Sequence, residues 1–152
     1  MRNKIPQSIF WSIVCAVILC AFSCATAQSQ NIEPEIKQYV QQKGEKAKVP
    51  ADISNFVRGD LNGDGAEDVV IQYYIQVGYP GNLTNTYLAV FLNKNGKMVF
   101  ASESDAAVVP AKIENKTLIC DKYGDGSKKF DKVGTVKFRL VKQKLVETKT
   151  KK

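Results

Sequence analysis

The chain has 152 residues, of which 24% are charged and 44% hydrophobic, with a formal net charge of +7. It contains no histidine, which excludes the commonest general base and the commonest zinc ligand. Only two arginines, Arg58 and Arg139, follow the first 27 residues. Base and phosphate recognition rely heavily on arginine, so we expect no nucleic-acid partner.

The first 27 residues follow the pattern of a secretory signal peptide. A basic start is followed by an apolar stretch from about Ile9 to Cys24 and by Ala25-Thr26-Ala27,. We expect cleavage after Ala27 and export to the periplasm or the exterior, with no transmembrane span after cleavage. Two alternatives stay open: an uncleaved anchor, and a lipoprotein anchored through Cys24, because the four residues ending there loosely resemble a bacterial lipobox.

The charge that remains after the predicted leader is positive. Residues 28–152 contain 20 basic and 15 acidic residues, a net charge of +5. Much of the excess is lysine near the C-terminus: Lys128, Lys129, Lys132, Lys137, Lys142, Lys144, Lys149, Lys151 and Lys152. The plainer interpretation is a solvated lysine-rich face, and the alternative is docking on anionic lipid or glycans.

Cysteine usage indicates how the fold is held together. Cys120 is the only cysteine beyond the predicted leader, so no intramolecular disulfide is expected despite export. A hydrophobic core must then stabilise the protein, and about 125 residues are enough for one domain.

One N-terminal helix is predicted within residues 32–44. Ile32, Ile36, Tyr39 and Val40 recur at the spacing of a single buried stripe,. Pro34 suits the first turn, and Gly44 is expected just beyond the end. A lysine-rich linker, residues 45–50, follows.

The rest of the chain has strand-like patterns. β-branched and aromatic residues between polar turns predict an antiparallel meander of about seven strands, with Asn95-Gly96 as the strongest hairpin turn. The strand-like stretches are residues 53–59, 69–77, 86–92, 98–101, 108–113, 118–121, 135–141 and 145–147. The expected fold class is α+β, mostly β, with the helix packed on the sheet.

The run from Asp60 to Asp68 is the most informative motif. It places Asp60, Asn62, Asp64 and Asp68 at positions 1, 3, 5 and 9 of one loop. Gly65 at position 6 allows a sharp turn, and the carbonyl of Ala66 at position 7 completes an all-oxygen set that suits Ca²⁺. An EF-hand needs a bidentate glutamate at position 12, where Ile71 stands, and it continues into a helix. We therefore expect a strand-loop-strand site that binds weakly, with a dissociation constant of about 0.1–1 mM.

The run from Gly59 to Val70 resembles the calcium loop of FG-GAP and VCBS-type repeats. The resemblance implies that Asp60, Asn62, Asp64 and Asp68 are side-chain ligands and that Ala66 is a carbonyl ligand. A β-propeller needs several such repeats, so one copy implies instead a small exported bacterial protein with a single loop. The alternative is an ordinary tight turn whose acids are solvated. Residues 121–127 repeat part of the pattern, but Tyr123 and Lys129 stand at positions 3 and 9, which favours a hairpin loop over a second cation site.

These observations predict a four-part chain: a signal peptide (1–27), a helix and linker (28–50), a β-rich calcium-loop domain (51–148) and a basic tail (149–152). The expected function is a non-enzymatic binding or envelope-interaction module with structural Ca²⁺ and an unknown protein or glycan partner. One rival is a basic protein that docks on anionic lipid or glycans without a metal. The other is a small hydrolase, which needs an acid/base pair outside the loop, among Glu103, Asp105 and Glu114.

Overall fold

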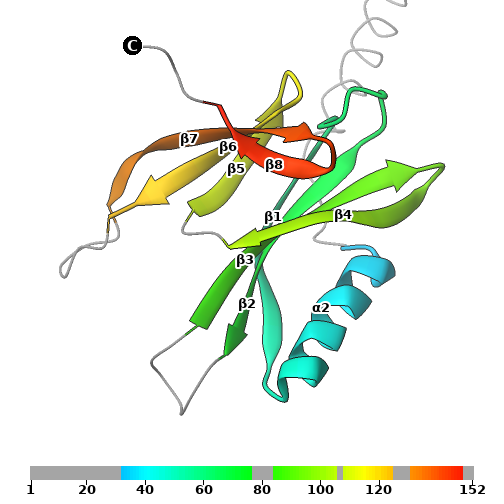
Figure 1. Ribbon diagram of the computed structural model, residues 1–152, viewed down its shortest axis with the longest axis vertical. Coiled ribbons are helices and arrows are strands. Elements are labelled where there is room, and N and C mark those ends of the chain that lie inside the picture. Colours follow the sequence, from blue (N-terminus) through cyan, green and yellow to red (C-terminus); the bar gives the residue numbers. More distant parts are fainter. Residues whose placement is uncertain (1–31, 77–83, 106–107, 125–130, 149–152) are drawn as a thin grey trace, which may run out of the picture. The chain divides into compact units, whose positions relative to one another are not determined.

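Two four-stranded antiparallel sheets and one helix make up the part of the chain that the computed structural model describes, residues 32–76, 84–105, 108–124 and 131–148. Sheet A has the order β1-β2-β3-β4, and sheet B has the order β5-β6-β7-β8 (Figure 1). The elements are α2 (Pro34–Ala47), β1 (Ala51–Gly59), β2 (Asp68–Gln76), β3 (Thr84–Lys94), β4 (Lys97–Asp105), β5 (Val108–Glu114), β6 (Thr117–Tyr123), β7 (Lys132–Val141) and β8 (Lys144–Glu147). They belong to one unit, Ile32–Lys152. The predicted signal peptide, the basic tail and residues 125–130, which include the end of the segment 121–127, lie outside the described residues.

The prediction of a mostly β fold with a helix is confirmed, but the single meander of about seven strands is wrong. Eight strands are described, and they split between β4 and β5 into two sheets. β5 lies beside β1 instead, where the Asn55 amide donates a hydrogen bond of 2.9 Å to the carbonyl of Pro110. The physical reason is that both faces of sheet A are apolar, and a second layer is needed to cover the face that the helix leaves open. The helix precedes every described strand, and the residues before position 32 are not described.

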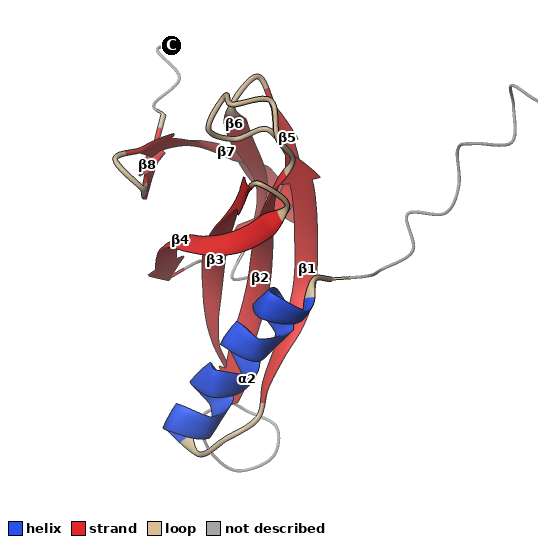
Figure 2. Cartoon of the chain, turned by 90° about the vertical axis from the view of Figure 1, so that its right-hand side faces the viewer, coloured by secondary structure: helices blue, strands red, loops and turns tan. Residues whose placement is uncertain are grey.

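The core has two parts, one on each face of sheet A. Alternate residues of β2 and β3 point to opposite faces. Val69, Ile71 and Phe91 pack with Ile36 and Val40 of α2, and Figure 2 shows the helix lying along the sheet. The second cluster joins sheet A to sheet B and consists of Leu61, Val70, Leu88, Val90, Leu92, Leu118 and Cys120. Sheet A is therefore the central layer, and the loop residue Leu61 belongs to its core.

The helix extends past its predicted end. Gly44, expected just beyond the C-terminus, lies inside α2, and the helix ends at Ala47, followed by the C-cap Lys48, whose φ of 57° is left-handed. Gly44 is required for packing, because a Cβ there would lie 2.8 Å from the carbonyl oxygen of Val49 and 3.2 Å from the Cβ of Ala51. The predicted linker is thus partly helical. No described helix has the length and apolar character that a membrane crossing needs.

The predicted Asn95-Gly96 hairpin is confirmed. Both residues have positive φ, 55° and 82°, as a two-residue type I′ turn requires. The turn connects β3 to β4, and it lies close to the acidic loop, as the contacts below show.

Candidate metal centre

The acidic loop connects β1 to β2, which confirms its predicted strand-loop-strand setting. Gly59 and Asp68 are register partners at the end of the β1–β2 ladder, so the residues between them leave the sheet and return at one point. The loop is short and closed at its base by backbone pairing. Its side chains are therefore held near one end of sheet A.

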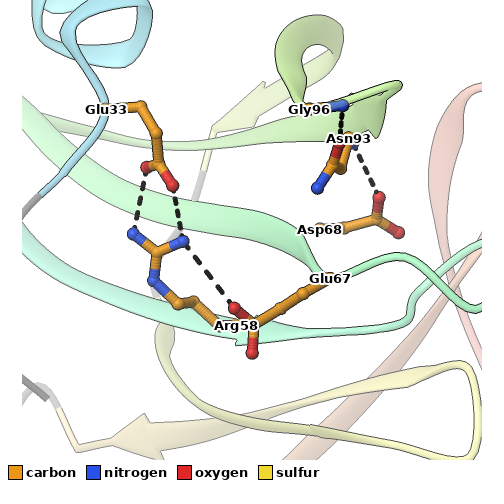
Figure 3. Close-up of polar contacts among 6 residues, drawn as sticks. All are labelled: Glu33, Arg58, Glu67, Asp68, Asn93 and Gly96. Carbon is orange, nitrogen blue, oxygen red and sulfur yellow. Dashed lines mark hydrogen bonds and ion pairs between the residues drawn. The ribbon is translucent and has the colours of Figure 1, made fainter.

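Asp68 fixes the loop to the sheet. Its side chain is fully buried, and its Oδ2 accepts hydrogen bonds from the backbone N–H groups of Leu61 (3.0 Å) and Asn62 (3.2 Å). Its Oδ1 accepts the N–H of Asn93 at 3.0 Å (Figure 3). The side chain of Asn93 in turn accepts the N–H of Gly96 at 2.8 Å. One carboxylate therefore joins the acidic loop to the β3–β4 turn.

Asp60 folds the first half of the loop around its own carboxylate. Its Oδ1 accepts the N–H of Gly63 at 2.5 Å, and its Oδ2 accepts the N–H of Gly65 at 3.1 Å. Both glycines have positive φ, 89° and 84°, a conformation that side chains rarely adopt. The predicted sharp turn at Gly65 is therefore confirmed, and Gly63 shares the same role.

Asn62 and Asp64 continue the same arrangement at the exposed tip. The amide oxygen of Asn62 accepts the N–H of Asp64 at 2.8 Å, and its Nδ2 donates to Asp64 Oδ2 at 2.7 Å. Asp64 Oδ1 accepts the N–H of Ala66 at 2.8 Å. The pKa of Asp64 is lowered by the Ala66 N–H and then by the Asn62 amide, which favours a carboxylate that stays ionised. Asp64 and Ala66 also line a surface cavity of about 570 Å³ shared with residues 93–96.

Two cations flank the loop. Arg58, at the end of β1, forms a bidentate pair with Glu33 at 2.6 and 3.0 Å and approaches Glu67 at 3.9 Å (Figure 3). The side chain of Lys116, from the β5–β6 turn, lies against Gly63, where a Cβ would come within 2.5 Å of its Cε. Part of the negative charge of the loop region is therefore already balanced by the protein.

The chemistry of the loop fits a hard cation, although its acids are not gathered into a finished site. Within the described residues, no three acidic or thiol side chains are placed to hold a metal. A carboxylate has about four acceptor positions; Asp60 uses two and Asp68 three for the hydrogen bonds above. Acceptor positions therefore remain at Asp60 and at the exposed Asp64, and all of the donors are oxygen, which suits Ca²⁺.

A second polar cluster was not recognised from the sequence. Glu103 of β4 accepts hydrogen bonds of 2.5 Å from the hydroxyls of Tyr39 and Tyr73 and pairs with Lys43 at 2.9 Å. Burial raises the pKa of Glu103, but the hydrogen bonds from the two tyrosines and Lys43 together outweigh it, so the pKa lies below its ordinary value. Burial and the nearby carboxylate raise the pKa of both tyrosines. The sequence pointed to Tyr39 only as part of the buried stripe of the helix and to Glu103 only as a candidate acid, and nothing in their spacing placed them together.

Of the three residues named for an acid/base pair, two lie on one strand of sheet A and the third lies on sheet B. Glu103 and Asp105 belong to β4 of sheet A, whereas Glu114 ends β5 of sheet B and pairs with Lys112 at 2.8 Å. Each of Glu103 and Glu114 already has a cationic partner. Among the described residues, no hydrogen bond joins any two of these three carboxylates, and the acidic loop remains the candidate site with the most oxygen ligands.

Comparisons with known proteins add no family to this description. No protein-family model, no curated protein and no solved structure matches the chain. The fold and site define the protein only as a helix-covered pair of antiparallel sheets with an oxygen-rich loop at one sheet end.

Proposed function

We propose that this protein is a small exported calcium-binding β protein that acts as a non-enzymatic binding module. Ca²⁺ is held by the side chains of Asp60, Asn62, Asp64 and Asp68 and by the carbonyl of Ala66. The observation that carries the proposal is the curling of the loop around the Asp60 carboxylate, which accepts the N–H groups of Gly63 and Gly65. This arrangement places alternate side-chain oxygens on one short, turned segment, as a calcium loop needs.

Ca²⁺ has a structural role in this proposal. The loop joins β1 to β2 and contacts the β3–β4 turn through Asp68, so a bound cation stabilises three strands at once. The chain has a single cysteine beyond its predicted leader, and the metal takes the place that a disulfide has in many exported domains. The side chain of Lys116 lies against the loop, and its positive charge weakens cation binding. Affinity is therefore expected at about 0.1–1 mM, in the range of extracellular modules.

Thermal unfolding of residues 28–152, the segment that contains every described element, tests the proposal. Ca²⁺ at ten times its dissociation constant adds about 1.4 kcal/mol to the free energy of unfolding, which raises the melting temperature by about 5 °C. A chelator reverses the change. Mg²⁺ at the same ionic strength gives a much smaller change, because it rarely occupies all-protein oxygen cages.

Two matched variants locate the effect. Asp64→Ala removes an exposed loop carboxylate and is expected to abolish the calcium-induced shift. Asp105→Ala removes an exposed carboxylate at the end of β4 and is expected to keep it. A melting temperature that does not respond to Ca²⁺, or that responds equally in both variants, would leave the loop as an ordinary turn.

A further inference from the structure

Sheet B has one face that no described layer covers. Leu118, Phe138 and Leu140 point inward and pack in the cluster shared with sheet A. Because side chains alternate along a strand, Lys137, Arg139 and Val141 of β7 point outward, and all three are exposed. The helix lies against sheet A (Figures 1 and 2). The outer face of sheet B is therefore open to a partner.

The acids on this outer face are already paired. Glu114 pairs with Lys112 at 2.8 Å, and Asp121 pairs with Lys132 at 2.6 Å. Both acids are thus neutralised locally. What remains on the face is positive charge.

Lys137 and Arg139 supply this remaining charge. Neither forms an ion pair with an acid of the described residues. Their register partners are apolar: Ile119 opposite Lys137, and Val146 opposite Arg139. The two cations line a surface hollow of about 420 Å³ together with Glu114, Asn115, Thr117, Ile119 and Thr148. The hydroxyls of Thr117 and Thr148 donate to the backbone carbonyls of Asn115 and Lys137. The hollow therefore offers two cations to an anionic group, beside a Glu114 carboxylate that Lys112 neutralises.

The charge of the chain is divided between the two sheets. The described residues of sheet B and its turns, 108–124 and 131–148, contain eight basic and four acidic residues, a net of +4. Residues 32–105 contain seven basic and ten acidic residues, a net of −3. An anionic surface is therefore attracted to sheet B and repelled by the layers of α2 and sheet A.

We propose that the outer face of sheet B docks on an anionic lipid surface. The charge explains attraction to an anion, and the exposed valines point to lipid as its source. Val141 and Val146 are 49% and 46% exposed and lie next to the cations on the same face. Aliphatic side chains among cations suit a membrane interface, where the valines enter the headgroup region while Lys137 and Arg139 meet lipid phosphates. A soluble sulfated glycan offers the valines nothing to contact.

Vesicle co-sedimentation of residues 28–152, without the apolar leader, tests this inference. Binding is expected to vesicles of phosphatidylcholine mixed with phosphatidylglycerol and not to phosphatidylcholine alone. A chelator is present throughout, so that the outcome is independent of the calcium proposal. A surface cation contributes about 1 kcal/mol near an anionic membrane, so the double variant K137Q/R139Q is expected to bind about thirtyfold more weakly.

Matched variants separate this face from the net charge of the protein. K37Q/K46Q removes two exposed cations from α2 and is expected to bind as the unchanged protein does. V141S/V146S keeps every charge and is expected to weaken vesicle binding about fivefold, the loss of partly buried valine surface. The proposal would be overturned if K137Q/R139Q and K37Q/K46Q weakened binding equally, or if the protein did not bind the anionic vesicles. Heparin binding that needs Lys137 and Arg139 while V141S/V146S leaves vesicle binding unchanged would also overturn it, because it would identify a glycan site.

Discussion

Replacing Asp68 tests whether one buried carboxylate holds the acidic loop on the sheet. Asp68→Ala leaves the N–H groups of Leu61, Asn62 and Asn93 without their acceptor. The bond from Leu61 is buried, and losing the partner of a buried donor costs about 1–3 kcal/mol. The other two are partly buried, so that water replaces some of the loss, and each costs about 1 kcal/mol. The expected loss in the free energy of unfolding is therefore about 3–5 kcal/mol.

Urea unfolding measured in a chelator checks this value without any contribution from a metal. With a slope of about 1.5–2 kcal/mol per molar, the midpoint falls by about 2 M. Asp68→Asn keeps the size of the side chain and one acceptor oxygen, so it provides a smaller loss if the alanine variant does not fold. Asp64→Ala, in the same loop but exposed, is the control and is expected to leave the midpoint almost unchanged. Equal midpoints for all of these variants would show that Asp68 does not anchor the loop.

Three other measurements test the packing of the sheets and helix. Gly44→Ala is expected to lower the free energy of unfolding by about 1 kcal/mol, because overpacking outweighs the gain in helix propensity; chemical unfolding measures it, and a stabilised variant would contradict it. The pKa of Glu103 is depressed from 4.5, against the effect of burial, by Tyr39 and Tyr73. The contribution of Glu103 to stability is therefore complete above pH 4.5 and lost as the pH falls through the folded pKa. The free energy of unfolding, measured at several acid pH values, should therefore fall less steeply with decreasing pH in E103Q than in the unchanged protein. Burial raises the pKa of Cys120 to about 12, so a thiol reagent should label the native protein only at its unfolding rate; immediate labelling would contradict a buried thiol.

Local features of the fold could be predicted because they depend on neighbouring residues. The stripe of Ile36 and Val40 indicated a helix, and Asn95-Gly96 indicated a hairpin turn, which their positive φ angles confirm. The end of the helix could not be predicted in the same way. Gly44 has the local character of a helix stop, but its lack of a Cβ serves contact with Val49 and Ala51, which follow the helix.

The candidate site, like the fold, could be predicted from the sequence only where it depends on neighbouring residues. Sequence spacing alone identified Asp60, Asn62, Asp64 and Asp68 as one group, and glycine at position 6 as a turn, because a loop of this length depends mainly on its own residues. It could not show that Asp68 is buried and bonded to Asn93, or that Lys116 lies against Gly63. Those contacts join residues far apart in the chain.

The sequence by itself determined the alternating pattern of the strands, the turns between them and the oxygen-rich loop, since each depends on residues a few positions apart. Only the tertiary structure decided that eight strands form two sheets, with β5 beside β1. The strand patterns are equally compatible with one continuous meander. The need to bury both apolar faces of sheet A separates the two arrangements. The continuous apolar runs of β2 and β3 express this need, but they do not show which strands form the covering layer. The division of the strands into two sheets also leaves Lys137 and Arg139 together on the open face of sheet B.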